Sequence, residues 1–238
     1  MNFKTRQLLG PALGLLLASV PALAGTYSRP VDREGEFRLR GGIFRPEGDS
    51  DYWRNIDRDF TTSDVKEFED PSFGLDYLLP LSDHLSLNFS GTFYQGETTG
   101  SYRNFVDNRG DRIRHDTKLD VSSATVGVVF HFAAPDAPVR PYLGAGGGAY
   151  PWRLEERGDF IDFRPNPDEV FTARLKSDGV AYGGYWLAGL DVPISRDLSL
   201  FAEGRWTKVD DTLDKDFEGF GKLDLSGRQV ELGLSWKL

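Results

Sequence analysis

The side chains best suited to acid–base or nucleophilic chemistry are few in this sequence. It contains three histidines and no cysteine, so thiol nucleophiles and cysteine-bound zinc are excluded. Nucleophilic hydrolysis would need a histidine base, a serine and an orienting carboxylate within hydrogen-bond reach of one another. His115 is the candidate base, with Asp116 and Ser122 near it only along the chain, whereas His84 lies beside a turn and His131 in a strand-like segment. A solvated loop histidine accounts better for His115, so the sequence predicts no catalytic residue.

Two acidic stretches are the candidates for a metal site. Clustered carboxylates bind calcium when several oxygens converge on one ion. Both stretches lack the spacing and the glycine of an EF-hand loop, and basic residues at 54, 58 and 215 are interleaved with the acids. We therefore expect solvated loops that bind neither a metal nor another cofactor. The acids are Glu47, Asp49, Asp51, Asp57 and Asp59 in the first stretch, and Asp210, Asp211, Asp214, Asp216 and Glu218 in the second.

The composition indicates which elements must position these residues. The chain has 238 residues, a net charge of -9, 27 glycines and 13% aromatic residues, while only 39% of its residues are hydrophobic. Many glycines and aromatics in so polar a chain favour an all-β protein and argue against disorder. Nucleic acid is not expected as a partner, because phosphate binding needs a basic surface.

The N-terminal segment has the features of a targeting sequence. Residues 1–24 begin with Lys4 and Arg6, continue with an apolar stretch of about 13 residues, and end with Ala22, Leu23 and Ala24. The apolar stretch is too short for the roughly 20 residues that a spanning helix needs. The sequence predicts a signal peptide over 1–24 and a single domain over 25–238.

The rest of the chain alternates between apolar and polar residues with period two, which is the strand period. In the last segment, for example, Val230, Leu232, Leu234 and Trp236 alternate with polar residues and glycine. Eight such segments are present, at 37–43, 73–79, 85–93, 123–132, 139–152, 182–192, 198–206 and 229–238.

The connections between these segments differ strongly in length. Three are short, at 80–83, 133–138 and 195–197, and four are long, at 47–71, 95–117, 154–178 and 208–227. Short turns at one end and long loops at the other are typical of a membrane barrel, in which closure satisfies every backbone group. The sequence predicts an all-β, eight-stranded antiparallel transmembrane β-barrel with short periplasmic turns and four long outer loops.

Charged residues occur on only one face of these segments. A charge facing lipid at mid-bilayer costs roughly 2 to 4 kcal/mol, so the charged faces should point into the barrel. An eight-stranded barrel is just wide enough for its own side chains to fill it, and buried charges must pair. We therefore expect a lumen charge network rather than an open pore, formed by Arg38, Arg40, Asp76, Arg140, Asp191, Glu203, Arg205, Glu231 and Lys237.

Several stretches carry a resemblance to a known family. They are VRPYLGAGGGAYPW at 139–152, GLDVPISRDLSLFAEGRW at 189–206, DYLLPLSDHLSLNFSG at 76–91 and VELGLSWKL at 230–238. The chain resembles the small outer-membrane β-barrel proteins of Gram-negative bacteria, the OmpA/OmpX-like barrel-domain family. Its end departs from that pattern, because Leu238 stands where an aromatic residue is common. The resemblance implies location in the bacterial outer membrane, contact with outer-membrane lipid and lipopolysaccharide, and insertion by the barrel-assembly machinery.

Function is less specified than fold. A structural or surface-interaction role, such as membrane integrity or adhesion, fits a filled barrel that acts as a monomer and not as an enzyme. A small porin-like channel for ions or small solutes is the alternative, and it would require the interior pairs to open. A lipid-modifying enzyme centred on His115 is a further alternative.

Overall fold

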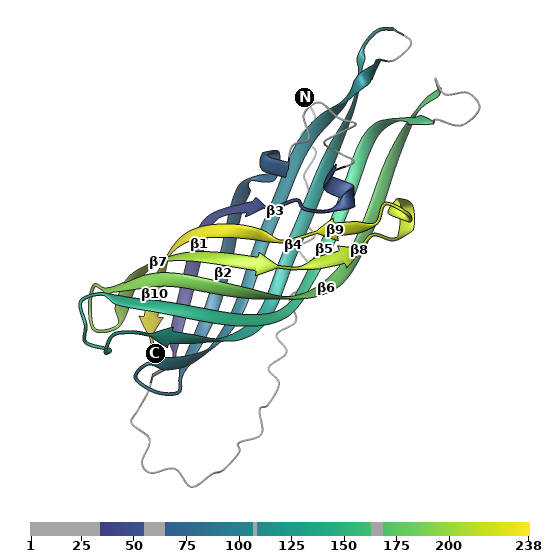
Figure 1. Ribbon diagram of the computed structural model, residues 1–238. Helices are drawn as coiled ribbons and strands as arrows, with labels where there is room; N and C mark the ends of the chain where they lie inside the picture. Colours follow the sequence, from purple (N-terminus) through teal and green to yellow (C-terminus); the bar gives the residue numbers. More distant parts are fainter. Residues whose placement is uncertain (1–33, 55–64, 107–108, 163–168) are drawn as a thin grey trace, which may run out of the picture. The chain divides into compact units, whose positions relative to one another are not determined.

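The computed structural model describes residues 34–54, 65–106, 109–162 and 169–238. The expected signal peptide at 1–24 lies outside these residues. Antiparallel strands account for most of the described chain, and they form one closed barrel of eight strands (Figure 1). No helix within the described ranges is long and apolar enough to cross a membrane.

The barrel strands follow one another in chain order around the ring. They are β1 (Glu36–Pro46), β2 (Asp70–Pro80), β3 (Leu85–Val106), β4 (Arg112–His131), β5 (Arg140–Asp162), β6 (Glu169–Pro193), β7 (Leu198–Lys208) and β10 (Gly227–Lys237). The ring closes because β1 pairs with β2 on one side and with β10 on the other. The predicted eight-stranded antiparallel barrel is therefore confirmed.

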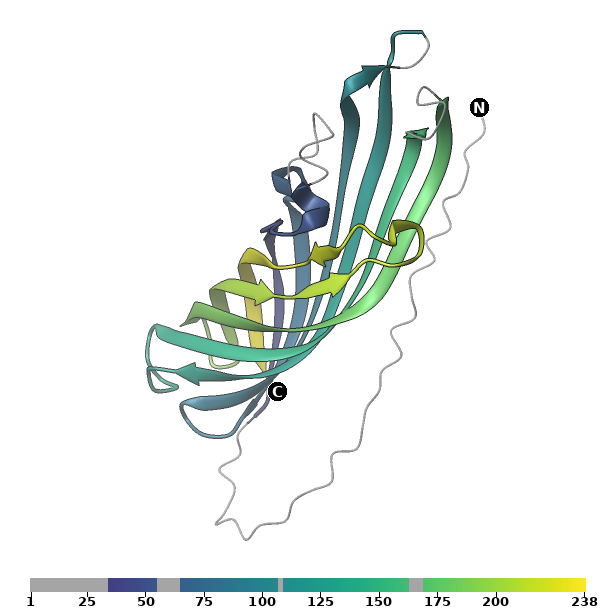
Figure 2. The same cartoon turned by 45° about the vertical axis from the view of Figure 1, so that its right-hand side comes forward.

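Four strands are much longer than the sequence indicated. The pairs β3–β4 and β5–β6 continue as hairpins far beyond the other strands, as Figures 1 and 2 both show. The prediction of outer loops over 95–117 and 154–178 is thus wrong for most of both ranges. The side chains still alternate there, but the apolar residues now lie on the inward face, so no apolar lipid-facing stripe marks these segments as strands.

The other two outer connections are compact. The connection from β1 to β2 contains a helical turn at 51–54 and the 3-10 helix η1 (Val65–Phe68), and its residues 55–64 lie outside the described part. The connection from β7 to β10 contains the small sheet of β8 (Asp210–Thr212) and β9 (Lys222–Asp224), with the 3-10 helix η2 (Lys215–Phe217) between them.

Inward and outward residues alternate in the barrel as predicted. Outward apolar side chains are widely exposed, for example Val230 at 73% and Leu232 at 68%, whereas the inward Glu231 between them is fully buried. Such an exterior would be unstable in water. It forms what we call the apolar band, which surrounds the part of the barrel that would lie in lipid.

Glycines make room for the large inward side chains. A Cβ at Gly74 would overlap the guanidinium of Arg40, and a Cβ at Gly189 would overlap the ring of Tyr142. Small residues opposite arginine and tyrosine thus let the narrow lumen hold both.

Candidate functional site

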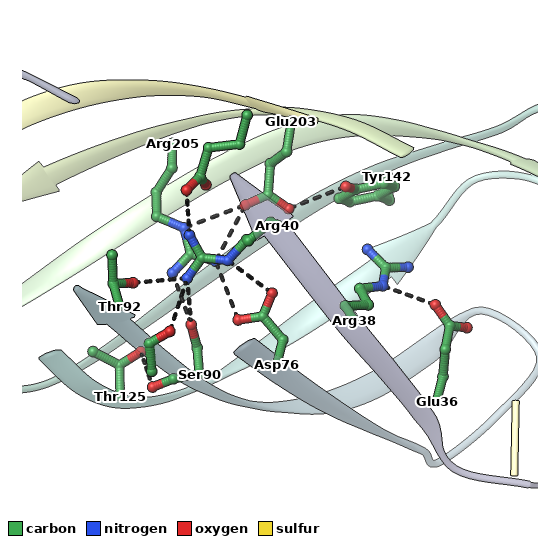
Figure 3. Close-up of polar contacts among 12 residues, drawn as sticks. Glu36, Arg38, Arg40, Asp76, Ser90, Thr92, Thr125, Tyr142, Glu203 and Arg205 are labelled. Atoms are coloured by element: carbon green, nitrogen blue, oxygen red, sulfur yellow. Dashed lines mark hydrogen bonds and ion pairs between the residues drawn. The ribbon is translucent and has the colours of Figure 1, made fainter. Parts of the chain in front are cut away.

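Arg40 is the centre of the polar interior. It projects inward from β1, between the strands β2 and β10 that flank it. Its Nε donates to Asp76 at 2.9 Å (Figure 3). Its Nη1 donates to Glu231 at 2.5 Å. Its Nη2 donates to the hydroxyls of Ser90 at 3.0 Å and Thr92 at 2.7 Å. The fully buried guanidinium of Arg40 therefore joins β1 to both of its neighbours in the barrel, β2 and β10.

Arg205 extends this network across the barrel from β7. It lies 3.1 Å from Glu203 and 3.8 Å from Asp76, and its guanidinium lies over the ring of Tyr185. Tyr142 on β5 donates its hydroxyl hydrogen to the second oxygen of Glu203 at 3.0 Å. The two buried arginines thus share Asp76, which links the two sides of the lumen.

A second group of charges lies nearer the short turns. Arg38 donates to Asp191 at 2.9 Å and to Glu36 at 2.8 Å, and its guanidinium lies over the ring of Tyr142. Asp191 also lies 3.1 Å from Nε2 of His131. His131 therefore lies on a strand, as the sequence analysis indicated, and faces the lumen at this end.

Seven of the nine residues expected in the lumen charge network are brought together by these contacts. The other two, Arg140 and Lys237, have no ion pair within 4 Å with any residue in the described ranges, although Arg140 is buried beside Asp191. The sequence analysis did not single out Ser90 and Thr92, whose hydroxyls bind Arg40. The signal that could have identified them is the period-two alternation, which places both side chains on the inward face of β3.

The outer mouth of the barrel is closed by an apolar cluster, which we call the outer cap. Its side chains from the connections pack on inward aromatics of the strands, including Tyr94, Tyr150 and Trp152. The connections contribute Tyr52, Trp53, Phe68, Leu213, Phe217, Leu223 and Leu225. The prediction of solvated loops at these two connections is therefore wrong.

Hydrogen bonds fix the cap to the barrel. The indole of Trp53 donates to the backbone oxygen of Asp224 at 2.9 Å, which joins the first outer connection to the last. Tyr52 donates to Glu156 on β5 at 2.6 Å. A cavity of about 30 Å³ lies under the cap, between Tyr94 and Arg205. This volume suits one or two water molecules and no larger solute.

The acidic residues of these connections mostly bind nearby donors. Asp49 and Asp51 pair with Arg54, and Asp210 pairs with Lys222. Asp211 accepts the indole N–H of Trp152 at 2.7 Å. Over the described ranges, no group of three or more histidine, aspartate or glutamate side chains is arranged to hold a metal, while Asp57 and Asp59 lie outside those ranges.

His115 is not the solvated loop residue that we expected. It lies on β4, almost fully buried beside Tyr102 and Phe160, and burial lowers its pKa to about 4. Asp116 faces the opposite side of β4 and accepts from Thr99. Ser122 is seven residues further along the strand, about 23 Å away at the strand rise. These three residues therefore cannot form a catalytic triad.

Glu156 is a buried acid of the outer cap, above the apolar band. Tyr52 is its hydrogen-bond donor, and burial among apolar side chains raises the pKa of Glu156 to about 7. The neutral acid is therefore favoured in the folded state, because a charge there is poorly solvated.

Charged residues cover the outward face of the long hairpins directly above the apolar band. In one row of cross-strand neighbours the charges alternate in sign, from Glu97 through Lys118 and Glu155 to Lys176. Arg174 binds Glu155 through two hydrogen bonds of 2.6 and 2.8 Å. The apolar exterior therefore ends at a sharp boundary.

These features define a transmembrane β-barrel of eight strands, with an apolar exterior and a closed, charged interior. No family model and no curated protein sequence matches the chain. Solved structures of outer membrane proteins are similar to it. For Neisserial surface protein A the identity is 13% and the TM-score 0.48, with 86% of this chain and 97% of that chain covered.

Two further solved structures are similar to the chain. The outer membrane protein OprG from Pseudomonas aeruginosa is 13% identical, with a TM-score of 0.49 and coverage of 86% of this chain and 96% of that chain. The outer membrane protease OmpT from Escherichia coli is 11% identical, with a TM-score of 0.39 and coverage of 86% and 94%. At these identities the likeness concerns the fold, and a fold alone does not decide whether a protein is an enzyme.

Proposed function

We propose that this protein is a monomeric barrel of the bacterial outer membrane with a structural and surface-interaction role, and that it neither conducts solutes nor acts as an enzyme. The observation that carries the proposal is the double closure of the barrel. The charge network around Arg40 fills the lumen, and the outer cap covers its mouth. A porin-like role would need both to open.

The exterior supports insertion in a membrane. Outward residues such as Phe73 at 65% and Tyr182 at 77% exposure are too apolar and too numerous for a surface in water. Because strands can cross a bilayer only when every backbone group is paired, ring closure between β1 and β10 supports the same conclusion.

The charged boundary fits contact with lipopolysaccharide. Lys118, Arg153 and Lys176 face outward just above the apolar band, where anionic headgroups would lie. Their acidic neighbours would meet divalent cations held between those headgroups. Insertion by the barrel-assembly machinery belongs to the same proposal.

Conductance and accessibility test the proposal. In planar bilayers the wild-type protein should show no stepwise conductance, because the buried ion pairs around Arg40 fill the lumen. In intact cells, external protease should cleave only within the outer connections and hairpins, and it should spare 133–138 at the opposite end. Regular conductance steps, or cleavage at 133–138, would contradict the proposal.

A further inference from the structure

A hollow interrupts the apolar band on the outward face of β5, β6, β7 and β10. Its volume is about 570 Å³, within the roughly 300 to 1,000 Å³ of small-molecule sites in proteins. Its floor is made of small residues, because Ala188 on β6 pairs with Gly204 on β7, and Ala202 follows toward the short turns. The larger outward residues around this floor are Leu143, Leu190, Val230 and Leu232. The hollow is therefore open to an apolar group from outside the protein.

Two stacked tryptophans close the hollow on its outer side. Trp186 and Trp206 are cross-strand neighbours, with ring centroids 3.8 Å apart and ring planes 5° from parallel. A Cβ at Gly204 would lie 2.9 Å from Trp206, so this indole lies over the glycine. Tryptophan is enriched at the level of lipid headgroups, because its ring is apolar at one end and polar at the other. The pair therefore places the outer end of the hollow near the headgroups.

Arg228 lies beside the tryptophan pair and has no acidic partner. It is the exposed, outward residue of β10 in the same cross-strand row as the pair, and Arg45 on β1 is next in that row. Arg45 is paired with Glu69, and Lys208 lies 3.7 Å from Glu47. Arg228, in contrast, forms no ion pair within 4 Å with any residue of the described ranges. An unpaired guanidinium at the edge of an apolar surface is complementary to a phosphate group.

The hollow lies in the outer half of the apolar band. Leu232 is four residues from Arg228, so at about 3.3 Å per residue it lies within roughly 13 Å of that arginine along the strand. The hydrocarbon core of a bilayer is about 30 Å thick, and barrel strands cross it at a tilt. A lipid with its phosphate at Arg228 would thus place an acyl chain in the hollow. In the outer leaflet of an outer membrane that lipid is lipopolysaccharide, whose lipid part, lipid A, carries phosphates and several acyl chains.

We propose that the hollow binds one acyl chain of lipid A, and that Arg228 binds a phosphate of the same molecule. The floor at Ala188 and Gly204 lets the chain lie close to the barrel wall, and the tryptophan pair separates the chain from the headgroup. The inference rests on the proposed contact with lipopolysaccharide, and it adds a binding site apart from the charged residues of the hairpins.

The first test concerns the phosphate. Native mass spectrometry of the full-length protein in detergent micelles counts bound lipid, with lipid A that carries two phosphates and the same lipid without phosphates as probes. The wild type should retain one lipid A molecule and should bind the phosphate-free lipid about tenfold more weakly, as the loss of charge-assisted hydrogen bonds implies. This comparison does not depend on the folding of any variant.

Variants then locate the phosphate. Arg228→Gln should bind lipid A about tenfold more weakly than the wild type, and it should bind the phosphate-free lipid equally well. Arg45→Gln is the matched control, because its guanidinium is already paired with Glu69, and it should bind lipid A like the wild type.

The second test concerns the hollow. Ala188→Leu fills the floor with a side chain that is compatible with lipid, so it should fold and should weaken the binding of both lipids several-fold, because the chain loses its close packing against the wall. Ala124→Leu makes the same change on the outward face of β4, outside the hollow, and it should bind both lipids like the wild type.

The outcomes separate this site from the proposed function. Equal binding of lipid A by the wild type, Arg228→Gln and Ala188→Leu would overturn the inference. Phosphatidylglycerol retained as strongly as lipid A would overturn it too, and would assign the hollow to a phospholipid. Weaker binding with Lys118→Gln but not with Arg228→Gln would support the proposed contact at the hairpins and overturn the site on β10. No retention of lipid A by the wild type would contradict both.

Discussion

The membrane part of the barrel and the hairpins above it are built from the same strands with opposite faces. On β5 and β6 the change falls near the paired residues Ala149 and Tyr182. Below them, outward residues such as Leu190 are apolar, and inward residues such as Asp191 are charged. Above them, Lys176 faces outward, while Leu154 faces inward and is fully buried.

This exchange of faces shows that solvent, and not the strand period, decides which side is apolar. In lipid the exterior must be apolar, and the interior collects the polar groups. In water the same pleat places charges outside, and the cap supplies an apolar layer inside. The point at which the faces exchange therefore marks the outer membrane boundary.

The largest effect is expected inside the membrane part. Arg40→Ala would leave Asp76 and Glu231 buried without their shared cation. Breaking a buried ion pair on one side costs roughly 3 to 5 kcal/mol. The unfolding midpoint in urea with lipid vesicles should fall accordingly, while Arg45→Ala, at an exposed pair with Glu69, should leave it unchanged. A midpoint equal to that of the wild type in Arg40→Ala would mean that water solvates the lumen charges.

The next largest effect is expected on the outward face of the strands, where the apolar band is compared with the hairpins above it. Leu232→Arg places a charge in the apolar band and should cost roughly 2 to 4 kcal/mol if the site is near mid-bilayer. Gln95→Arg places the same charge on the outward face above the boundary, where no cost is expected. Folding yield into lipid vesicles measures both. Equal yields for the two variants would show that the boundary is misplaced.

The stability of the outer cap should depend on pH. The pKa of Glu156 is about 7 in the folded protein, against an ordinary value of 4.5. The folded state therefore holds the proton more tightly, so the free energy of unfolding should fall as the pH rises from about 4.5 to about 7, and level off above that. The total is about 3 kcal/mol.

The variant Glu156→Gln isolates this contribution. It keeps an acceptor for Tyr52 and removes the titrating group, so its unfolding midpoint should lack the decline between about pH 4.5 and about pH 7. Chemical denaturation at a series of pH values measures the difference. A decline of the same size in both proteins would assign it to other groups.

The smallest effect is expected on the outward face of the hairpins. Arg174→Ala removes the two hydrogen bonds to Glu155, but solvent and Lys176 remain beside that carboxylate. The unfolding midpoint should not shift measurably, because exposed ion pairs contribute little to stability. A clear decrease would indicate that the charged rows act as a cooperative network.

The sequence was sufficient for the barrel but not for the regions above it. An apolar outward stripe, as at Val230 and Leu232, revealed each strand where lipid selects it. The upper parts of β3 to β6 lack that stripe, so their sequence predicts loops. The buried positions of Tyr52 and Trp53 could not be predicted, because they depend on contacts between two connections more than 150 residues apart in sequence.

The sequence predicts which residues belong to the lumen charge network better than it predicts which of them form ion pairs with one another. Inward parity selected Arg40, Asp76 and Glu231 as lumen residues. Which carboxylate meets which guanidinium depends on the stagger of neighbouring strands, and this is set by the pairing of β1 with both β2 and β10. Arg140 shares the parity but has no partner within ion-pair distance among the described residues.

The pairing of β1 with β10 has a consequence for the order of events in biogenesis. Glu36 on β1 pairs with Lys237 on β10. One edge of β1 therefore stays unpaired until β10 has arrived. Until then β1 and β7 both present open edges, which can aggregate with other unfolded chains. The chain must therefore be kept apart from other chains during its whole passage across the periplasm. A protein truncated before β10 should persist only while another molecule covers the open edges of β1 and β7.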